Sequence, residues 1–266
     1  MSTFSEEHFQ YLKKQKIENR WIHFGRISII LLFLLSWEVL VRLSLLNSFL
    51  YSSPSHILKT IYSLFLTGEL EKHIGITMYE VLLSFVLGNS IGFIISFFFW
   101  KYRIFSKIMD PYLTILNSLP KVALGPLIII WMGAGIRSII LMTLLISIFT
   151  TIIHIYNGFM SVPNHYLILL KSMGATSLQI FLKLILPYNL EVIFATLKTN
   201  ISLCFIGVIM GELLVSKSGL GYLIMYGSQV FQLDLVISSV FILGILSCLF
   251  YYFIDWTLLF IKRKRN

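Results

Sequence analysis

Six apolar stretches, each long enough to cross a lipid bilayer, dominate the chain. A helix needs about 20 mainly apolar residues to span the hydrocarbon core. The suitable stretches cover residues 25–45, 77–100, 112–133, 136–156, 190–214 and 235–260. They are continuously apolar rather than alternating, which favours helices over a barrel. With 57% hydrophobic and 12% charged residues, against about 25% charged in soluble proteins, the sequence predicts an all-α integral membrane protein with six transmembrane helices.

The basic residues predict which side of the membrane each end of the chain occupies. Cationic flanks of spans stay in the cytoplasm, and with six spans the two termini lie on the same side. Most of the 21 Lys and Arg residues belong to that side, whereas the other side holds Lys59, Lys72, Arg137 and Lys217. Both termini are therefore predicted to be cytoplasmic. Topology also explains the net charge of +9, so nucleic acid is not an expected partner.

The same pattern predicts how the chain is organised. Residues 1–24 form a cytoplasmic N-terminal tail, and residues 25–69 hold the first transmembrane helix and a short helix on the outer surface. Ser53 is the expected N-cap of this short helix, with Pro54 at its first position. Residues 70–260 form the main membrane region, and residues 261–266 a basic cytoplasmic tail.

The third apolar stretch contains an unusual number of helix-breaking residues. Together with the two residues before it, this stretch carries Pro111, Pro120 and Pro126 and several glycines. Proline lacks a backbone donor and clashes with the preceding turn, so we expect this span to be kinked or broken near its cytoplasmic end. Broken spans often line transport pathways, but Pro and Gly are also common in ordinary transmembrane helices. Both interpretations stay open.

The stretch KSMGATSLQIFLKLILP interrupts the apolar runs with two short amphipathic pieces. From Asn164 onward, apolar residues recur at the spacing of one helical face: Tyr166, Leu169, Leu170 and Met173. Gly174 suits the end of that helix, Ser177 can cap a second one, and Pro187 separates it from the fifth span. The pattern predicts a bent helical pair on the cytoplasmic side. Periodicity alone also allows the pair to lie flat on lipid.

This stretch resembles the cytoplasmic coupling motif of permease subunits of binding-protein-dependent ABC importers. That motif reads E-A-A, three residues, Gly, nine residues, Ile, one residue and Leu-Pro. Gly174, Leu186 and Pro187 match it, and Leu184 replaces the isoleucine. The E-A-A positions are occupied here by Ile168, Leu169 and Leu170.

Three further segments, SSPSHIL, DPYLTILNSLPKVALGPLIIIWMGAG and GELLVSKSGLGYLI, resemble permeases of the nitrate, sulfonate, bicarbonate and taurine type in order and spacing. The resemblance runs over about residues 52–258. It implies a type I ABC importer transmembrane domain over residues 70–260, with coupling helices at 163–187. It also implies a multi-pass protein of the bacterial plasma or inner membrane.

The resemblance implies several partners. A second copy of the permease completes the pathway, most simply as a homodimer, although a heterodimer with a similar permease is the alternative. Two cytoplasmic ABC ATPase subunits bind ATP and Mg²⁺, and an extracytoplasmic solute-binding protein delivers the substrate. No cofactor is expected in this chain itself. Its four Lys-Ser or Lys-Thr pairs lack the preceding glycine of a phosphate-binding loop.

Two sets of site residues follow. The resemblance assigns contact with the ATPase to Lys171, Ser172, Met173, Gly174, Ala175, Leu186 and Pro187. Polar side chains within spans are costly in lipid and are pathway candidates: Asn117, Ser118, Lys121, Thr143, Ser147, Thr199, Ser202 and Glu212. Helix packing is the alternative for the hydroxyl residues. Glu38 and Arg42 are expected to form an ion pair within the first span.

The function predicted from these observations is that of a permease subunit that couples a translocation pathway to a separate ATPase. A small anion such as a sulfonate, taurine or nitrate is the expected substrate, and a thiamine precursor or riboflavin is the alternative. A channel or a membrane enzyme is the alternative class. The six His residues show no metal-binding spacing, and no nucleophilic or acid-base constellation is present in the sequence, so neither a catalytic nor a metal site is predicted.

Overall fold

The computed structural model describes residues 6–265, and all elements within this range are helical. The first five residues of the predicted N-terminal tail and Asn266 of the basic tail lie outside the described residues. The chain forms two compact units, one ending at Ser63 (unit 1) and the other beginning at Leu64 (unit 2).

Within residues 6–265, five helices are long and apolar enough to span a membrane. They are α1 (Glu6–Arg42), α4 (Glu69–Lys101), α7 (Ile136–Met160), α11 (Leu190–Val215) and α13 (Leu233–Arg265). A further span consists of α5 (Arg103–Ser118) followed by η1 (Lys121–Leu124) and α6 (Gly125–Met132), with a bend of 81° between the two parts. Counted as one broken span, this segment brings the total to six, as the sequence predicts.

The break in this span lies elsewhere than expected. α5 continues through Pro111, and the chain leaves the helix after Ser118, in the middle of the segment rather than near its cytoplasmic end. Leu119 has an extended backbone with φ −64° and ψ 143°. This is the conformation that a following proline imposes, because the ring of Pro120 excludes the helical region for the residue before it.

In unit 1, one acidic side chain joins the end of α1 to the start of α3 (Pro54–Leu66). Glu38 pairs with Arg42 at 2.7 Å between Nε and Oε1, which confirms the expected ion pair. Glu38 also accepts hydrogen bonds from the backbone N–H of Ser55 at 3.1 Å and from its hydroxyl at 3.0 Å. The Ser53 hydroxyl accepts the N–H of His56 at 3.3 Å, so the expected N-cap is confirmed. Between α1 and α3, a single helical turn forms α2 (Ser48–Tyr51).

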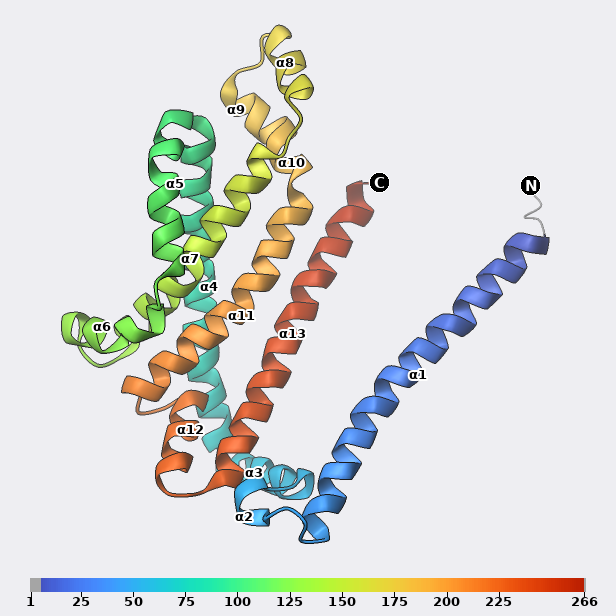
Figure 1. Ribbon diagram of the computed structural model, residues 1–266, viewed down its shortest axis with the longest axis vertical. Coiled ribbons are helices and arrows are strands. Elements are labelled where there is room, and N and C mark those ends of the chain that lie inside the picture. Colours follow the sequence, from blue (N-terminus) through green and yellow to red (C-terminus); the bar gives the residue numbers. More distant parts are fainter. Residues whose placement is uncertain (1–5, 266) are drawn as a thin grey trace. The chain divides into compact units, whose positions relative to one another are not determined.

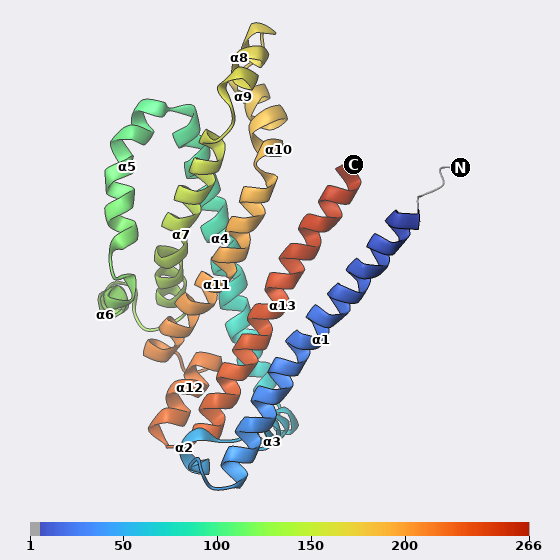
Figure 2. The ribbon, with the colours of Figure 1, turned by 45° about the vertical axis from the view of Figure 1, so that its right-hand side comes forward.

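In unit 2, α7 packs against both α4 and α11 (Figures 1 and 2). Small residues permit the close approach. A Cβ added at Gly92 of α4 would lie 2.6 Å from Thr151 Cγ2, and one added at Gly207 of α11 would lie 2.7 Å from Thr143 Cα. Association of membrane helices depends on such close backbone contact, because lipid provides no hydrophobic drive for it. The glycines therefore hold the three central spans together.

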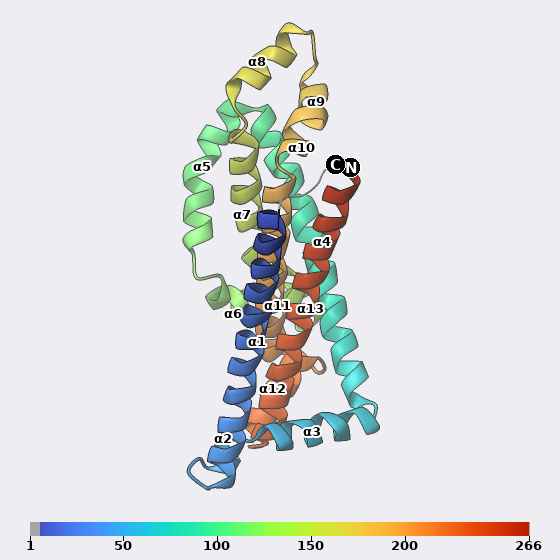
Figure 3. The ribbon, with the colours of Figure 1, turned by 90° about the vertical axis from the view of Figure 1, so that its right-hand side faces the viewer.

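The remaining elements of unit 2 lie at its two ends. α12 (Leu220–Gln229) packs between α11 and α13 at one end, which we call the α12 end (Figure 3). The opposite end, the α8 end, carries α8 (Asn164–Ser172), α9 (Ser177–Ile180), the π-turn η2 (Phe181–Ile185) and α10 (Leu186–Tyr188). Two ion pairs, Lys198 with Asp255 and Lys262 with Glu191, join α13 to α11.

Replacing Gly207 by alanine should destabilise the bundle. The new methyl group would meet backbone of α7 rather than a movable side chain, and overpacking of this kind costs about 1–3 kcal/mol. Gly244→Ala in α13 is the matched control, because a Cβ there meets no atom within 4 Å. Thermal unfolding of the detergent-purified chain should show a lower midpoint for Gly207→Ala than for the control. Equal midpoints would show that α7 and α11 do not pack as described.

Candidate functional site

The bend at the α8 end is formed as the sequence predicts, by a glycine that ends α8. Gly174 has φ +78°, a left-handed conformation that favours glycine. Its N–H donates to the carbonyl of Lys171 and that of Ala175 to the carbonyl of Leu170, both at 3.0 Å, which closes the end of the helix. A Cβ at Gly174 would meet no atom within 4 Å. The backbone conformation, and not packing space, therefore requires glycine.

The cap of the second helix is one residue earlier than expected. Thr176, not Ser177, is the N-cap, and its hydroxyl accepts the N–H of Gln179 at 3.3 Å. Gln179 returns a bond, because its Oε1 accepts the N–H of Thr176 at 2.8 Å. This reciprocal capping box needs Glu or Gln three residues after the cap. With Ser177 as the cap, Ile180 would hold that position and could not return the bond.

Pro187 acts on the second helix through the turn that precedes it. Proline has no N–H to donate to the carbonyl four residues earlier, and the helix widens into the π-turn η2 directly before α10. α11 then begins at Leu190, after Asn189 with φ −96° and ψ 12°. The second helix is thus separated from the fifth span, as expected, but only by a wide turn and by Asn189. The second helix and α11 consequently follow one another almost directly.

Phe181 is the point at which the α8 end packs against the spans. Its ring centroid lies 4.6 Å from that of Phe97, and 5.2 Å from those of Trp100 and Phe159. Phe181 is 4% exposed. We call Phe93, Phe97, Trp100, Phe159 and Phe181 the aromatic cluster. Because α4 and α7 supply the other rings, Phe181 connects η2 to both of these spans.

The predicted apolar face of α8 divides between two environments. Leu170 packs against the hydrophobic core around the aromatic cluster. Tyr166, Leu169 and Met173 stay exposed, and Met173 retains 74% of its accessible surface. An exposed apolar surface of this kind needs a partner or lipid to cover it.

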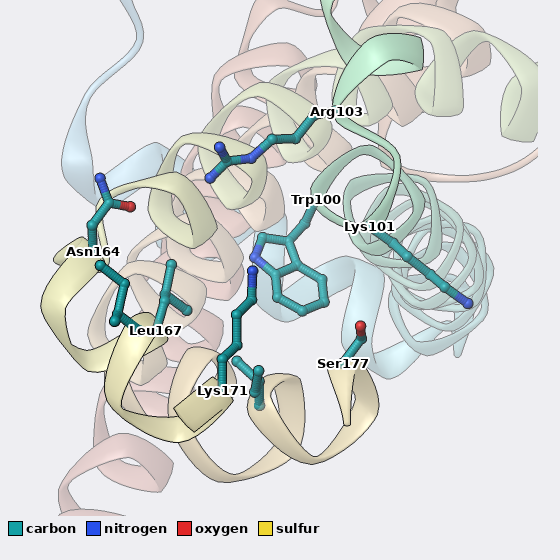
Figure 4. A pocket seen from close by; sticks show the side chains of 9 residues that line it. Trp100, Lys101, Arg103, Asn164, Leu167, Lys171 and Ser177 are labelled. Atoms are coloured by element: carbon teal, nitrogen blue, oxygen red, sulfur yellow. The ribbon is translucent and has the colours of Figure 1, made fainter. Parts of the chain in front are cut away.

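The predicted ATPase-contact residues are not all at one place. Ser172, Met173 and Gly174 form the exposed tip of the bend, and Ala175 packs beneath it against the hydrophobic core. Lys171 is also exposed, but its side chain lines a cavity together with Trp100 (Figure 4). Two further predicted residues, Leu186 and Pro187, lie in α10 at the junction with α11.

At the broken span, the structure brings two predicted pathway residues together. The ammonium group of Lys121 donates a hydrogen bond to Asn117 Oδ1 at 3.0 Å, across the bend. It also lies 5.4 Å from the ring centroid of Phe149 on α7, within the range of a cation–π contact. The Ser118 hydroxyl instead donates to the carbonyl of Thr114 within α5. A lysine in an apolar segment is costly in lipid and typically marks a pathway.

The predicted hydroxyl residues of α7 and α11 have different surroundings. Thr143 and Ser147 are buried, and each donates a hydrogen bond to the carbonyl four residues earlier in α7. Packing, the alternative left open above, accounts for these two side chains; their place in a pathway stays a prediction. Thr199 and Ser202 are exposed on α11 and share one face of it. That exposed polar face can contact a second copy of the chain or line a pathway.

Glu212, the remaining pathway candidate, is buried and holds the start of α12. It is 1% exposed. Its Oε1 accepts the hydroxyl of Thr77 at 2.7 Å, and its Oε2 accepts the N–H of Gly221 at 2.5 Å. The Thr77 hydroxyl in turn accepts the N–H of Leu220 at 2.8 Å. Side chains of α4 and α11 thus bind the backbone donors that the first turn of a helix leaves free.

This arrangement explains the G-L-G sequence that follows Glu212. A Cβ at Gly219 would collide with the Glu212 carboxylate, and one at Gly221 would lie 2.7 Å from Glu212 Cβ. Gly219 also has φ +113°, and its N–H donates to His73 Nδ1 at 2.9 Å. The buried carboxylate of Glu212 therefore requires glycine at both positions. We call His73, Thr77, Glu212, Gly219 and Gly221 the α12 clasp.

Several polar residues of the core were not singled out by sequence reasoning. His73, Thr77 and Glu80 are buried on α4. Their spacing of four and three residues places them on one helical face, a signal that was available in the sequence. Asn200 of α11 was also missed. Its Nδ2 donates to Asn89 Oδ1 on α4 and to Thr151 Oγ1 on α7, each at 2.6 Å.

Comparison with known proteins identifies relatives over most of the chain. Residues 88–266 match the family described as binding-protein-dependent transport system inner membrane component. An ABC transporter permease protein of Haemophilus influenzae is 31% identical, over 85% of this chain and 91% of the relative. The formylaminopyrimidine transport permease protein ThiX of Halalkalibacterium halodurans is 30% identical, over 82% of this chain and 87% of the relative. SsuC of Bacillus subtilis, described as an aliphatic sulfonates transport permease, is 29% identical over 79% and 76%.

Solved structures share the fold. The inward-facing MetNI methionine ABC transporter aligns with a TM-score of 0.58 and 18% identity, over 73% of this chain and 96% of the compared chain. A bacterial ABC transporter that imports the acidic polysaccharide alginate aligns with a TM-score of 0.65 and 12% identity, over 92% and 97%.

Thr77→Val should loosen the α12 clasp. The substitution keeps the shape of the side chain but leaves the N–H of Leu220 and one oxygen of Glu212 without their partner, and each such buried group costs about 1–3 kcal/mol. Thr114→Val is the matched control, because that hydroxyl bonds only the carbonyl of Asp110 in its own helix. Limited trypsin digestion at Lys217, in the loop before α12, should accelerate in Thr77→Val alone. Unchanged cleavage would remove Thr77 from the clasp.

Proposed function

We propose a transport mechanism that proceeds from one premise: the chain belongs to the family of binding-protein-dependent transport system inner membrane components. It is accordingly a multi-pass permease subunit of an ABC importer in the bacterial inner membrane, and not an enzyme. Such a subunit works with the other components of an ABC importer.

The α8 end is the surface on which the ATPase acts. The observation that carries this proposal is the exposed apolar surface of Met173 at the tip and of Leu169 beside it. The neighbouring residues Leu170 and Ala175 pack against the buried core that holds the aromatic cluster. An apolar helix face seated in a groove of a partner is a common mode of recognition. If the tip only rested on lipid, its rigid connection to α4 and α7 would serve no purpose. With both termini in the cytoplasm, the α8 end faces the cytoplasm and the α12 end faces outward.

The ATPase subunits bind ATP and Mg²⁺, and their closure moves α8. Phe181 transmits this displacement to α4 and α7 through the aromatic cluster, and the π-turn η2 leads it into α11. Packed side chains move as a body because protein interiors are close-packed and yield little. The spans consequently reorient, and the pathway opens toward the outside.

Two copies of the chain enclose the pathway. Thr199 and Ser202 form an uncovered polar face on α11, and polar groups in a membrane usually face a protein interior or a water-filled cavity. We assign this face to the pathway, together with Lys121 and Asn117 at the broken span. A homodimer needs no further gene product, and a heterodimer with a similar permease would use the same surfaces. An extracytoplasmic solute-binding protein delivers substrate at the α12 end.

A small anion, such as a sulfonate, is the substrate that the chain supports best. Lys121 offers a cation within the broken span, where a negatively charged solute can be stabilised. The likeness to SsuC agrees with this choice. The second candidate is a thiamine precursor, because the likeness to ThiX is equally extensive.

Met173→Glu should remove the ATPase from the transporter. A carboxylate at the most exposed position of the tip would have to be desolvated in the groove of the partner, which costs several kcal/mol for an unpaired charge. Met173→Leu keeps the apolar surface and is the matched control. Native mass spectrometry of complexes purified from the host membrane should show two permeases with two ATPases for the wild type and for Met173→Leu. Met173→Glu should yield the permease alone.

A lone chain in all three samples, in several mild detergents, would contradict the importer assembly. Retention of the ATPase by Met173→Glu would instead place the contact away from the tip.

Gly174→Val should uncouple ATP hydrolysis from uptake. A β-branched residue at φ +78° is strained by about 1–2 kcal/mol, so the bend will relax and change the direction of α8. Gly174→Asn is the control, because asparagine tolerates the left-handed region. In proteoliposomes, Gly174→Val should hydrolyse ATP with little uptake, while Gly174→Asn retains both activities. Normal uptake by Gly174→Val would exclude the bend from the mechanism.

A further inference from the structure

A cavity of about 460 Å³ lies at the α8 end, between the junction of α4 with α5 and the α8–α9 pair (Figure 4). Its lining includes Trp100, Arg103, Asn164, Leu167, Lys171 and Ser177. Since a water molecule occupies about 30 Å³ in the liquid, the cavity is much larger than a single inorganic anion needs. It is also separate from the exposed tip of the bend and from the polar residues assigned to the pathway.

The cavity is positively charged without compensation. Arg103 and Lys171 extend from opposite walls toward the same space, whereas the side chain of Lys101 points away from it (Figure 4). Within residues 6–265, neither Arg103 nor Lys171 forms an ion pair, and none of the residues that line the cavity is acidic. Two cations held near one another repel, and an anion between them removes this repulsion.

The position of the cavity matches the level of the lipid headgroups. Trp100 and Lys101 are the last two residues of the α4 span, and Trp and Lys are the residues that anchor spans at the membrane–water interface. Leu167 and the ring of Trp100 add apolar surface beside the two cations. A free phosphate ion would leave that apolar surface in contact with water. A phospholipid would fill both parts, because its phosphate continues into a glycerol group and acyl chains.

We propose that this cavity binds the phosphate of an anionic phospholipid of the cytoplasmic leaflet, between Arg103 and Lys171. The guanidinium group can donate two parallel hydrogen bonds to phosphate oxygens, and Asn164 and Ser177 supply further donors. A zwitterionic headgroup suits the cavity less well, because its ammonium group would find no acidic partner there. Basic pockets between spans on the cytoplasmic side are suited to such headgroups. The inference rests on the proposed function in one respect, the cytoplasmic placement of the α8 end.

The bound lipid connects α8 to the start of α5. Lys171 belongs to the last turn of α8, whereas Arg103 is the first residue of α5. A phosphate held by both side chains joins the coupling helices to the spans at a second point, beside the aromatic cluster. The lipid composition of the membrane would then set how firmly α8 is held.

Trp100 provides a reporter for the test. In a chain with Trp21, Trp37, Trp131 and Trp256 replaced by Phe, Trp100 is the remaining tryptophan. The chain is reconstituted in phosphatidylcholine vesicles that contain phosphatidylglycerol or phosphatidylcholine dibrominated near the glycerol end of the acyl chain. Dibrominated phosphatidylglycerol should quench Trp100 more strongly than dibrominated phosphatidylcholine at the same mole fraction.

The charge variants identify the site. In Arg103→Gln/Lys171→Gln, the preference for phosphatidylglycerol should fall about 25-fold, because each cation facing an anionic headgroup contributes about fivefold. Lys107→Gln/Lys183→Gln removes the same charge from exposed positions of α5 and η2 that do not line the cavity, and it should leave the preference unchanged. Native mass spectrometry of the same variants with all five tryptophans retained should show a parallel loss of bound phosphatidylglycerol, which guards against misfolding of the reporter chain.

Four results would overturn the proposal. Equal quenching by the two lipids, or an equal loss in the control variant, would mean that general surface charge attracts the lipid. Relief of quenching by added inorganic phosphate would identify free phosphate as the occupant. Loss of the lipid preference when the ATPase is bound would make the cavity a protein interface. Because ATPase binding is scored separately by mass spectrometry, failure of the lipid site and failure of the importer assembly give different results.

Discussion

The burial of Phe181 is the interaction on which the α8 end depends. α8 has nine residues, and α9 has four. Isolated helices shorter than about 12–15 residues are marginal in water, so these pieces owe their shape to what they pack against. Phe181 fixes the second helix against Phe97, Trp100 and Phe159, and Leu170 fixes α8 against the same core. The contact that lets the short helices fold is therefore the same contact that can transmit force to the spans.

The α12 end meets a different physical demand. The first turn of α12 leaves backbone donors free, and inside a membrane protein water does not reach all of them. Glu212, Thr77 and His73 supply the acceptors from two other helices. The two ends of unit 2 are thus held in opposite ways, one by apolar packing and the other by hydrogen bonds to a buried carboxylate. The directed hydrogen bonds of the clasp favour one position of α12.

The features that depend on residues close together in the sequence could be predicted from it. Apolar length predicted the spans, and the isolated glycine predicted the end of α8 at Gly174. The cap at Thr176 was missed although its partner Gln179 stood in the sequence, because Ser177 is an equally good capping residue by type alone. The aromatic cluster and the bonds of Asn200 join residues more than fifty positions apart in several cases, and no periodicity within one helix reveals such pairs. To predict the break after Ser118, one would have to know which of the three prolines the tertiary structure tolerates within a helix.

The departure from the E-A-A pattern has a physical meaning in this fold. The three positions hold Ile168, Leu169 and Leu170, so the end of α8 presents apolar surface where the family pattern has a carboxylate. Leu170, at the second alanine position, packs inward on the core, and Leu169, at the first, adds its exposed surface to that of Met173. The loss of the carboxylate also leaves Lys171 without an acidic neighbour on its own helix, since residues 164–172 contain no Asp or Glu. The added apolar surface of Leu169 and the uncompensated charge of Lys171 are two consequences of the departure from the E-A-A pattern, the first at an alanine position and the second at the glutamate position. The tip suits a protein groove, and the cation suits an anion that the chain itself does not supply.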